Sequence, residues 1–97
     1  MVVIVAGTGR IDVLKRDQAI AAAIEMQNAT ILEDGCISYR FYSDLEDPSL
    51  FHVYEEWESM EHLSRHFVAP HMSVWREKQK DFAVGAFEIK KFEATQF

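Results

Sequence analysis

The stretch from Cys36 to Trp57 most constrains the fold, because it holds two strand patterns joined by a short turn. Cys36–Ser43 is rich in aromatic residues, and Leu50–Trp57 alternates in side-chain character as a half-buried strand does. The polar stretch between them contains Asp47 and Pro48, which are typical turn residues. The sequence therefore predicts an antiparallel hairpin in the middle of the chain.

A strand and a helix are predicted before this hairpin. The run Val2–Thr8 is apolar and β-branched, which indicates a buried strand. Val13–Leu32 has helical spacing, Asp12 is placed to cap this helix, and Gly35 is placed to stop it in a left-handed conformation. The predicted buried stripe of the helix is Val13, Ile20, Ile24, Gln27 and Ile31.

A second helix and a last strand are predicted after the hairpin. Ser59 is placed to cap the helix, and Pro70 breaks or kinks it. Gly85–Ala94 is the last strand. The order β-α-β-β-α-β predicts a ferredoxin-like α+β fold, with a four-stranded antiparallel sheet and helices on one face. The predicted apolar stripe before Pro70 is Met60, Leu63 and Phe67, and Met72, Trp75, Gln79 and Phe82 continue with helical spacing after it.

The strand Leu50–Trp57 also predicts a partner for the sheet. Its odd-numbered positions are mainly apolar, and Leu50 and Tyr54 add apolar surface on the other face. Two helices cover only one face of a sheet, and a large apolar patch is rarely left in water. We expect a homodimer in which two copies pack their uncovered sheet faces together about a two-fold axis.

Size and composition exclude several classes of protein. The 97 residues fit one domain spanning residues 1–97, and a net charge of −6 argues against a nucleic-acid partner. Cys36 is the single cysteine, which excludes an intramolecular disulfide and suits a reducing compartment. Val2–Ala6 is too short to span a membrane and lacks the features of a secretion signal. We expect a cytoplasmic protein with no membrane association.

Glu55 is the residue whose position most needs an explanation. Strand alternation places it on the same face as Phe51, Val53 and Trp57. An unpaired charge in such a layer costs several kcal/mol, so the carboxyl group must find a partner, bind a proton or take part in chemistry. Periodicity alone favours a structural acid bonded to a nearby His, Tyr or backbone N–H.

Four short motifs in order along the chain resemble the antibiotic biosynthesis monooxygenase domain, specifically its small quinol monooxygenase branch. They are Glu33-x-Gly35-Cys36-x-x-Tyr39, Glu55-x-Trp57-Glu58-Ser59, His62-Leu63-x-x-His66 and Pro70-His71-Met72. The resemblance implies a dimeric α+β barrel, with a pocket between sheet and helices in each subunit. It also implies a cofactor-independent monooxygenase that oxidises a quinol or hydroxylated aromatic with molecular oxygen, without flavin or metal.

Such chemistry needs a base, a hydrogen-bond donor for an oxyanion and a dry pocket. His66 is the candidate base because histidine titrates near neutral pH, and Glu55 is the candidate to orient it. The Tyr39 hydroxyl or His71 is expected to hydrogen-bond a quinone oxygen. Flat apolar walls for the aromatic ring are expected from Trp57, Tyr39, Phe51 and Trp75.

Alternatives stay open from the sequence. His66 can instead be a core histidine satisfied by Glu55, and the aromatic residues can be core packing. An isomerase of a small phosphorylated dione would need Arg or Lys in the pocket, and a ligand-binding or haem-binding dimer would show no turnover. His62 and His66 with His71 or His52 have metal-ligand chemistry but not the zincin pattern, so we expect no metal site.

Overall fold

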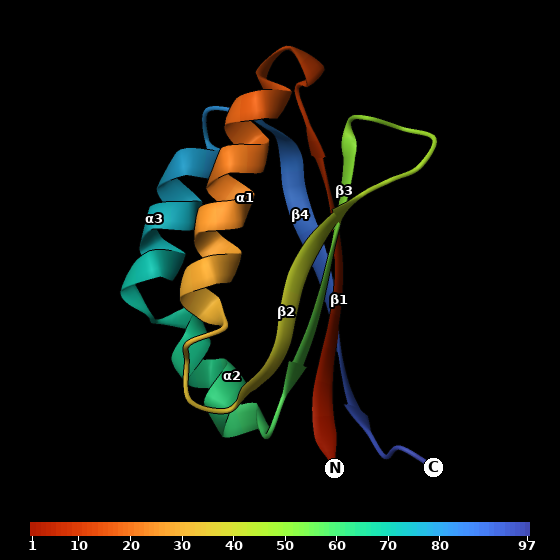
Figure 1. Ribbon diagram of the computed structural model, residues 1–97, viewed down its shortest axis with the longest axis vertical. Helices are drawn as coiled ribbons and strands as arrows, with labels where there is room; N and C mark the ends of the chain where they lie inside the picture. Colours follow the sequence, from red (N-terminus) through yellow and green to blue (C-terminus); the bar gives the residue numbers. More distant parts are fainter.

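The chain forms an antiparallel sheet with all its helices on one face (Figure 1). The computed structural model describes residues 1–97. The sheet order is β2-β3-β1-β4, which confirms the predicted ferredoxin-like α+β fold. The strands are β1 (Val2–Ile11), β2 (Cys36–Ser43), β3 (Leu50–Trp57) and β4 (Ala83–Ala94), and the helices are the 3₁₀ turn η1 (Val13–Lys15), α1 (Arg16–Thr30), α2 (Met60–Phe67) and α3 (Pro70–Gln79).

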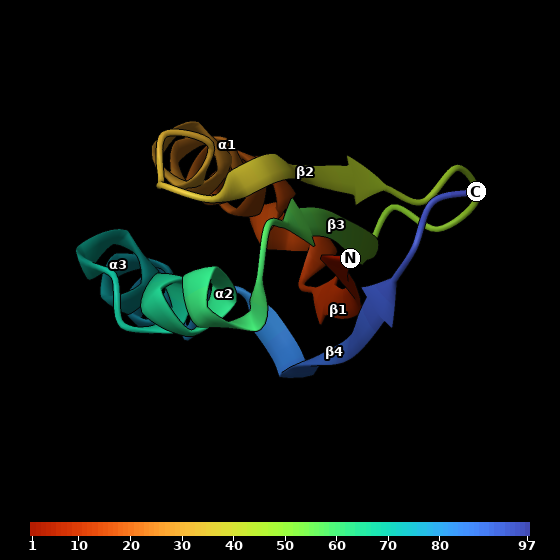
Figure 2. The ribbon, with the colours of Figure 1, turned by 90° about the horizontal axis from the view of Figure 1, so that it is seen from below.

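The two faces of the sheet have different environments. Phe51, Val53, Glu55 and Trp57 of β3 are all buried under the helices, as the alternation predicted. Seen along the sheet, the helices lie to one side only and the opposite face is uncovered (Figure 2). Side chains of the uncovered face are only partly buried, and Phe92 of β4 is half exposed. The uncovered face is the surface on which the dimer prediction rests.

The buried stripe of α1 differs from the predicted one. Val13, Ile24 and Ile31 are each about half exposed, so that prediction was wrong. The helix instead buries small residues, which let its axis approach the sheet and α3 closely. Gln27 has a separate role, because its Oε1 accepts the Phe41 backbone N–H at 3.0 Å. The buried residues of α1 are Ala19, Ala22, Ala23, Met26 and Thr30.

Pro70 divides the second helical region into two helices. Ser59 caps α2 as predicted, since its Oγ accepts the His62 backbone N–H. The buried face of α2 holds Leu63 and His66, whereas Met60 is 40% exposed and does not belong to it as predicted. Pro70 starts α3, where its missing N–H costs no helix hydrogen bond. The break between the helices brings His66 and His71 to the same junction.

Glycines shape the sheet beneath the helices. The first strand does not end at Thr8 as predicted, because β1 continues to Ile11. A Cβ on Gly9 would overlap the ring of Phe87. The missing side chain therefore makes room for Phe87 of β4 to lie over β1. Gly35 has φ +80° and precedes β2, so its left-handed conformation is confirmed, although α1 itself already ends at Thr30.

Candidate active site

A cavity of about 470 Å³ lies between the sheet and the α2–α3 pair. This volume is within the range of small-molecule sites. Its walls are mainly apolar and include five aromatic side chains, several of which pack against one another: Trp75 lies 5.0 Å from Phe41 and 5.8 Å from Phe87 between ring centroids. The polar groups facing the cavity come from Tyr39, Glu55, His66, Arg76, Gln79 and Lys80.

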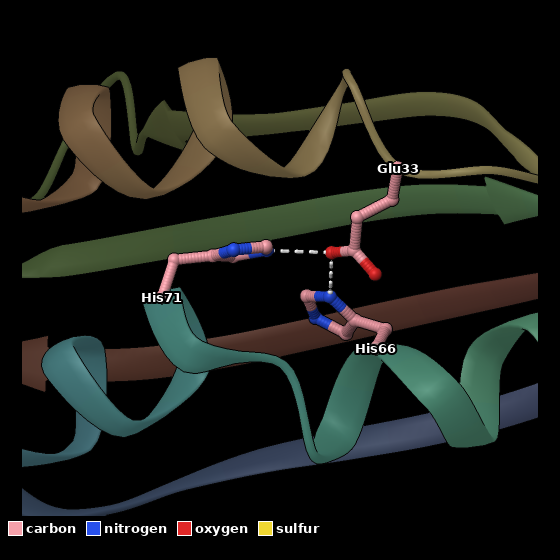
Figure 3. A group of neighbouring side chains, drawn as sticks. All are labelled: Glu33, His66 and His71. Atoms are coloured by element: carbon pink, nitrogen blue, oxygen red, sulfur yellow. Dashed lines mark hydrogen bonds and ion pairs between the residues drawn. The ribbon is translucent and has the colours of Figure 1, made fainter.

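Glu33 holds two histidines at the junction of α2 and α3 (Figure 3). Its Oε2 lies 2.6 Å from His66 Nδ1 and 2.6 Å from His71 Nε2. His66 is 1% exposed, whereas the side chain of His71 is 23% exposed. Because a carboxylate accepts hydrogen bonds, each imidazole presents an N–H to Glu33. Glu33 therefore fixes both rings from the loop that follows α1.

The bond to Glu33 determines which His66 nitrogen is available for chemistry. With Nδ1 as the donor to Glu33, a neutral ring leaves Nε2 as an unprotonated acceptor. Nε2 has no hydrogen-bond partner in the protein. Every fully buried side-chain nitrogen or oxygen has such a partner, so Nε2 is not fully buried. Since His66 lines the cavity, Nε2 is accessible there. This is the arrangement of a general base with a carboxylate behind it.

Burial keeps His66 neutral at physiological pH. Loss of hydration lowers the pKa of His66 below its usual value, and the charges of His71 and Arg76 lower it further. The hydrogen bond and the negative charge of Glu33 oppose this shift by raising the pKa of His66. The pKa of His66 is lowered overall. The ring is therefore neutral and can accept a proton from a bound substrate.

Glu55 does not orient His66, contrary to the prediction. Its Oε1 accepts the Trp57 indole N–H at 2.9 Å, and Glu33 takes the place beside His66. Glu55 is 5% exposed, and burial raises its pKa to about 7, although the Trp57 hydrogen bond acts in the opposite direction. The Glu55 carboxyl group can therefore exchange a proton near neutral pH within the cavity.

The pKa of Glu55 predicts a pH-dependent stability. Its ordinary pKa is 4.5, so between about pH 4.5 and 7 the folded chain binds more protons than the unfolded chain. The contribution of Glu55 to stability is thus present at low pH and is lost as pH rises through this window. Between pH 4 and pH 8 the unfolding free energy of wild type should therefore fall by about 3 kcal/mol more than that of Glu55→Gln, which has no carboxyl group at this position. Urea unfolding of both proteins at the two pH values measures this difference.

A matched control for this measurement is Glu56→Gln on the opposite face of β3. Glu56 accepts the Tyr54 hydroxyl at 2.8 Å on the uncovered face. Its replacement should leave the difference in unfolding free energy between the two pH values close to that of wild type, provided that sedimentation shows the same assembly state. A Glu55→Gln protein whose unfolding free energy depends on pH as that of wild type does would show that the pKa of Glu55 is not raised in the fold.

Tyr39 supplies a hydrogen-bond donor to the cavity. It is 7% exposed, and burial together with the nearby charges of Glu55 and Glu33 raises the pKa of its hydroxyl. The hydroxyl therefore stays protonated at neutral pH. It has no hydrogen-bond partner in the protein and is not sealed from solvent, so it is free to donate to a ligand. Tyr39 thus lines the cavity, and its contact with a quinone oxygen stays a prediction.

Three other predicted ligand contacts lie outside the cavity lining. Phe51 and Trp57 are 3% and 0% exposed and belong to the core, because they lie at the ends of β3 while the cavity lies over its middle. His71 holds Glu33 instead of facing the cavity, so its predicted contact with a quinone oxygen is corrected to a positioning role. Trp75 does line the cavity.

Two residues of the site had no predicted role. Glu33 stands in the first motif, but its sequence position at the end of a helix gave no sign of a partner 33 residues away. Arg76 lines the cavity, and its Nη2 donates to the Phe67 carbonyl oxygen at 2.6 Å. Arg76 directly follows Trp75 in the sequence, so spacing alone did not distinguish it from the other basic residues of α3.

Residues with metal-ligand chemistry form two separate groups. Glu33, His66 and His71 offer ligand atoms within 4.8 Å of one another, as do Asp34, Glu58 and His62. His62 and His66 thus belong to different groups, and His52 lies 3.0 Å from Asp44 in the hairpin. The four histidines do not converge. Cys36 is also a poor ligand or nucleophile, because burial raises the pKa of its thiol to about 11.

The family model for antibiotic biosynthesis monooxygenase matches residues 2–78, and the chain belongs to this family. An uncharacterized protein of Synechocystis sp. is 30% identical over 94 residues, which are 97% of this chain and 64% of that protein. The chain therefore spans less than two thirds of that relative. No helix of the chain has the length and apolar character needed to cross a membrane.

Solved structures from other organisms share the fold. A protein of unknown function from Bacteroides thetaiotaomicron, described as a possible oxidoreductase, is 25% identical with a TM-score of 0.88, covering 96% of this chain and 97% of its own. A Deinococcus radiodurans protein, whose name suggests an antibiotic biosynthesis monooxygenase, is 24% identical with a TM-score of 0.90, covering 98% and 94%. Both likenesses show the shared fold, in agreement with the family assignment.

Proposed function

We propose that the protein is a cofactor-independent monooxygenase of a quinol or hydroxylated aromatic. The observation that carries the proposal is the buried Glu33–His66 pair, which presents an unprotonated Nε2 to an aromatic cavity. A hydroxylated ring can lie against the wall formed by the Phe41, Trp75 and Phe87 side chains, with its hydroxyl directed to His66. The Tyr39 hydroxyl then donates to the oxygen that becomes negatively charged.

The proposed reaction balances without an external reductant. His66 Nε2 takes the proton of a substrate hydroxyl, and the electron-rich oxyanion passes electrons to molecular oxygen, which forms a peroxide on the ring. Breaking the O–O bond leaves one oxygen atom on the ring and releases the other as water. The ring loses two hydrogens, gains one oxygen and becomes a quinone. Glu55, with a pKa of about 7, can supply the proton to the departing oxygen.

The test is oxygen consumption by EDTA-treated protein with a reduced naphthoquinol, set against a blank for autoxidation. Labelled ¹⁸O₂ and mass spectrometry should place one labelled atom in the product. Consumption equal to the blank across a panel of quinols and phenols contradicts the proposal. Saturable binding of those compounds without consumption would instead indicate a ligand-binding protein, and haem binding can be followed by its absorbance in the same preparation.

An isomerase of a small phosphorylated dione is the second candidate. Arg76 and Lys80 at the cavity are the cations that such a substrate requires. The aromatic walls favour the oxygenase instead, because a small phosphorylated dione has little apolar surface to bury. Isomerisation needs no oxygen, so turnover of a phosphorylated dione under anaerobic conditions distinguishes the two activities.

We also propose that the active form is a homodimer, made by the uncovered faces of two sheets. The supporting residues are the half-exposed Tyr42 and Phe92, together with Leu50 and Tyr54. Sedimentation velocity at micromolar concentration should give about twice the 11.2 kDa chain mass. Phe92→Glu should yield monomer, and a monomeric wild type contradicts the proposal. A cytoplasmic location is part of the same proposal, since Cys36 is a free thiol.

A further inference from the structure

The cavity carries positive charge that no acidic residue neutralises. Arg76 lines the cavity and forms no ion pair with any carboxylate of the chain, although acidic residues outnumber basic ones by six. Its only hydrogen bond joins Nη2 to the Phe67 carbonyl oxygen. A guanidinium has five N–H groups, so most of them stay available to a ligand. Lys80, in contrast, is paired with Glu77 at 3.0 Å.

A second cation, Lys91, lies near the ring of Phe67. Lys91 Nζ lies 5.4 Å from the centre of the Phe67 ring, and Lys91 also has no acidic partner. Phe67 itself lines the cavity. Arg76 and Lys91 therefore both contact Phe67, one through its backbone carbonyl and the other through its ring. Phe67 thus has two cations without acidic partners beside it, of which Arg76 lines the cavity and Lys91 does not.

The position of Arg76 relative to His66 limits the ligand that fits both. The guanidinium is close enough to lower the pKa of His66 through its charge, while its side chain is exposed to solvent. A ligand whose hydroxyl reaches the buried His66 would thus direct its outer end toward Arg76. A carboxylate is the group that matches a guanidinium in shape, because two parallel N–H···O bonds can form.

We propose that the cavity has an anion subsite at Arg76, with Lys91 contributing charge, and that the substrate is a hydroxylated aromatic carrying a carboxylate. This inference rests on the proposed function, because it assigns the substrate class of the same site. The ring is held by the aromatic walls, its hydroxyl faces His66, and its carboxylate binds the Arg76 guanidinium. A neutral ring of the same size lacks only the last contact.

Binding of two redox-stable probes separates these contacts. The probes are 6-hydroxy-2-naphthoate, whose hydroxyl and carboxylate lie at opposite ends of the ring system, and 2-naphthol, titrated against the whole chain by tryptophan fluorescence or calorimetry. Wild type should bind the acid about tenfold more tightly than the naphthol, consistent with a charge-assisted pair of hydrogen bonds. Arg76→Gln should remove this preference while leaving the affinity for 2-naphthol unchanged, and Lys91→Gln should reduce the preference.

The control is Lys78→Gln on the same helix, because Lys78 pairs with Glu25 at 2.6 Å and does not line the cavity. It should keep the preference for the acid. Arg76 also donates to the Phe67 carbonyl oxygen, so thermal melting must show that Arg76→Gln is folded. If it is not, the loss of preference for the acid in Lys91→Gln tests the subsite instead. Equal affinity for both probes in wild type, or no binding of either, overturns the subsite. Oxygen consumption with a neutral quinol tests the proposed function separately.

Discussion

Replacing His66 with glutamine should lower the rate of quinol-dependent oxygen consumption by about 10²–10⁴-fold, the usual contribution of a positioned general base. Glutamine keeps a side-chain N–H for Glu33 and fills most of the space beside Trp57, whose ring centroid lies 4.9 Å from that of His66. It has no group that takes a proton near neutral pH. The measurement is kcat from initial oxygen uptake, corrected for autoxidation.

The control for this variant is His52→Gln. His52 lies on the uncovered face of β3, 3.0 Å from Asp44, and has no contact with the cavity. It should keep the wild-type rate, provided that sedimentation shows the same assembly state. His66→Ala tests the same role but leaves a void, so it is informative only if its melting temperature stays close to that of wild type. Unchanged uptake in a folded His66→Gln protein would remove His66 from the mechanism.

Replacing Glu33 with glutamine should lower kcat by about 10–100-fold without removing any group that contacts the substrate. The amide lacks the charge that holds the His66 N–H, so the orientation of the ring and the position of its proton are no longer fixed. Both the negative charge and the hydrogen bond of Glu33 raise the pKa of His66, so their loss should lower that pKa further and weaken the base. Proton NMR titration of His66 measures this shift directly.

The comparison for Glu33→Gln is Asp34→Asn, the adjacent acid. Asp34 is mainly exposed and lies 3.6 Å from both His62 and Arg65, so it should change neither kcat nor the His66 titration. A merely structural role for Glu33 predicts a lower melting temperature with an unchanged His66 pKa in the folded protein. That result would separate the stability of the junction from its catalytic role.

The sequence alone determined the strand order along the chain and the face on which each β3 residue lies. Alternation from Phe51 to Trp57 has only two possible phases, so it placed Glu55 correctly in the buried layer. Pro70 and Ser59 act through their own backbone and side chain, and each ended or began a helix as local chemistry requires. The α1 stripe could not be predicted in the same way, because alanines and larger apolar residues alternate around that helix and only the facing surface decides which are buried.

The partners of the buried polar groups were decided by the tertiary structure. Glu33 and His66 are 33 residues apart, and they meet only because the loop after α1 packs against the junction that Pro70 makes between α2 and α3. Glu55 is nearer to His66 in sequence, yet its carboxylate accepts a hydrogen bond from the Trp57 indole two residues away. Sequence periodicity gives the direction of a side chain from its own element. Which atom it meets depends on how separate elements pack, and that is a property of the whole fold.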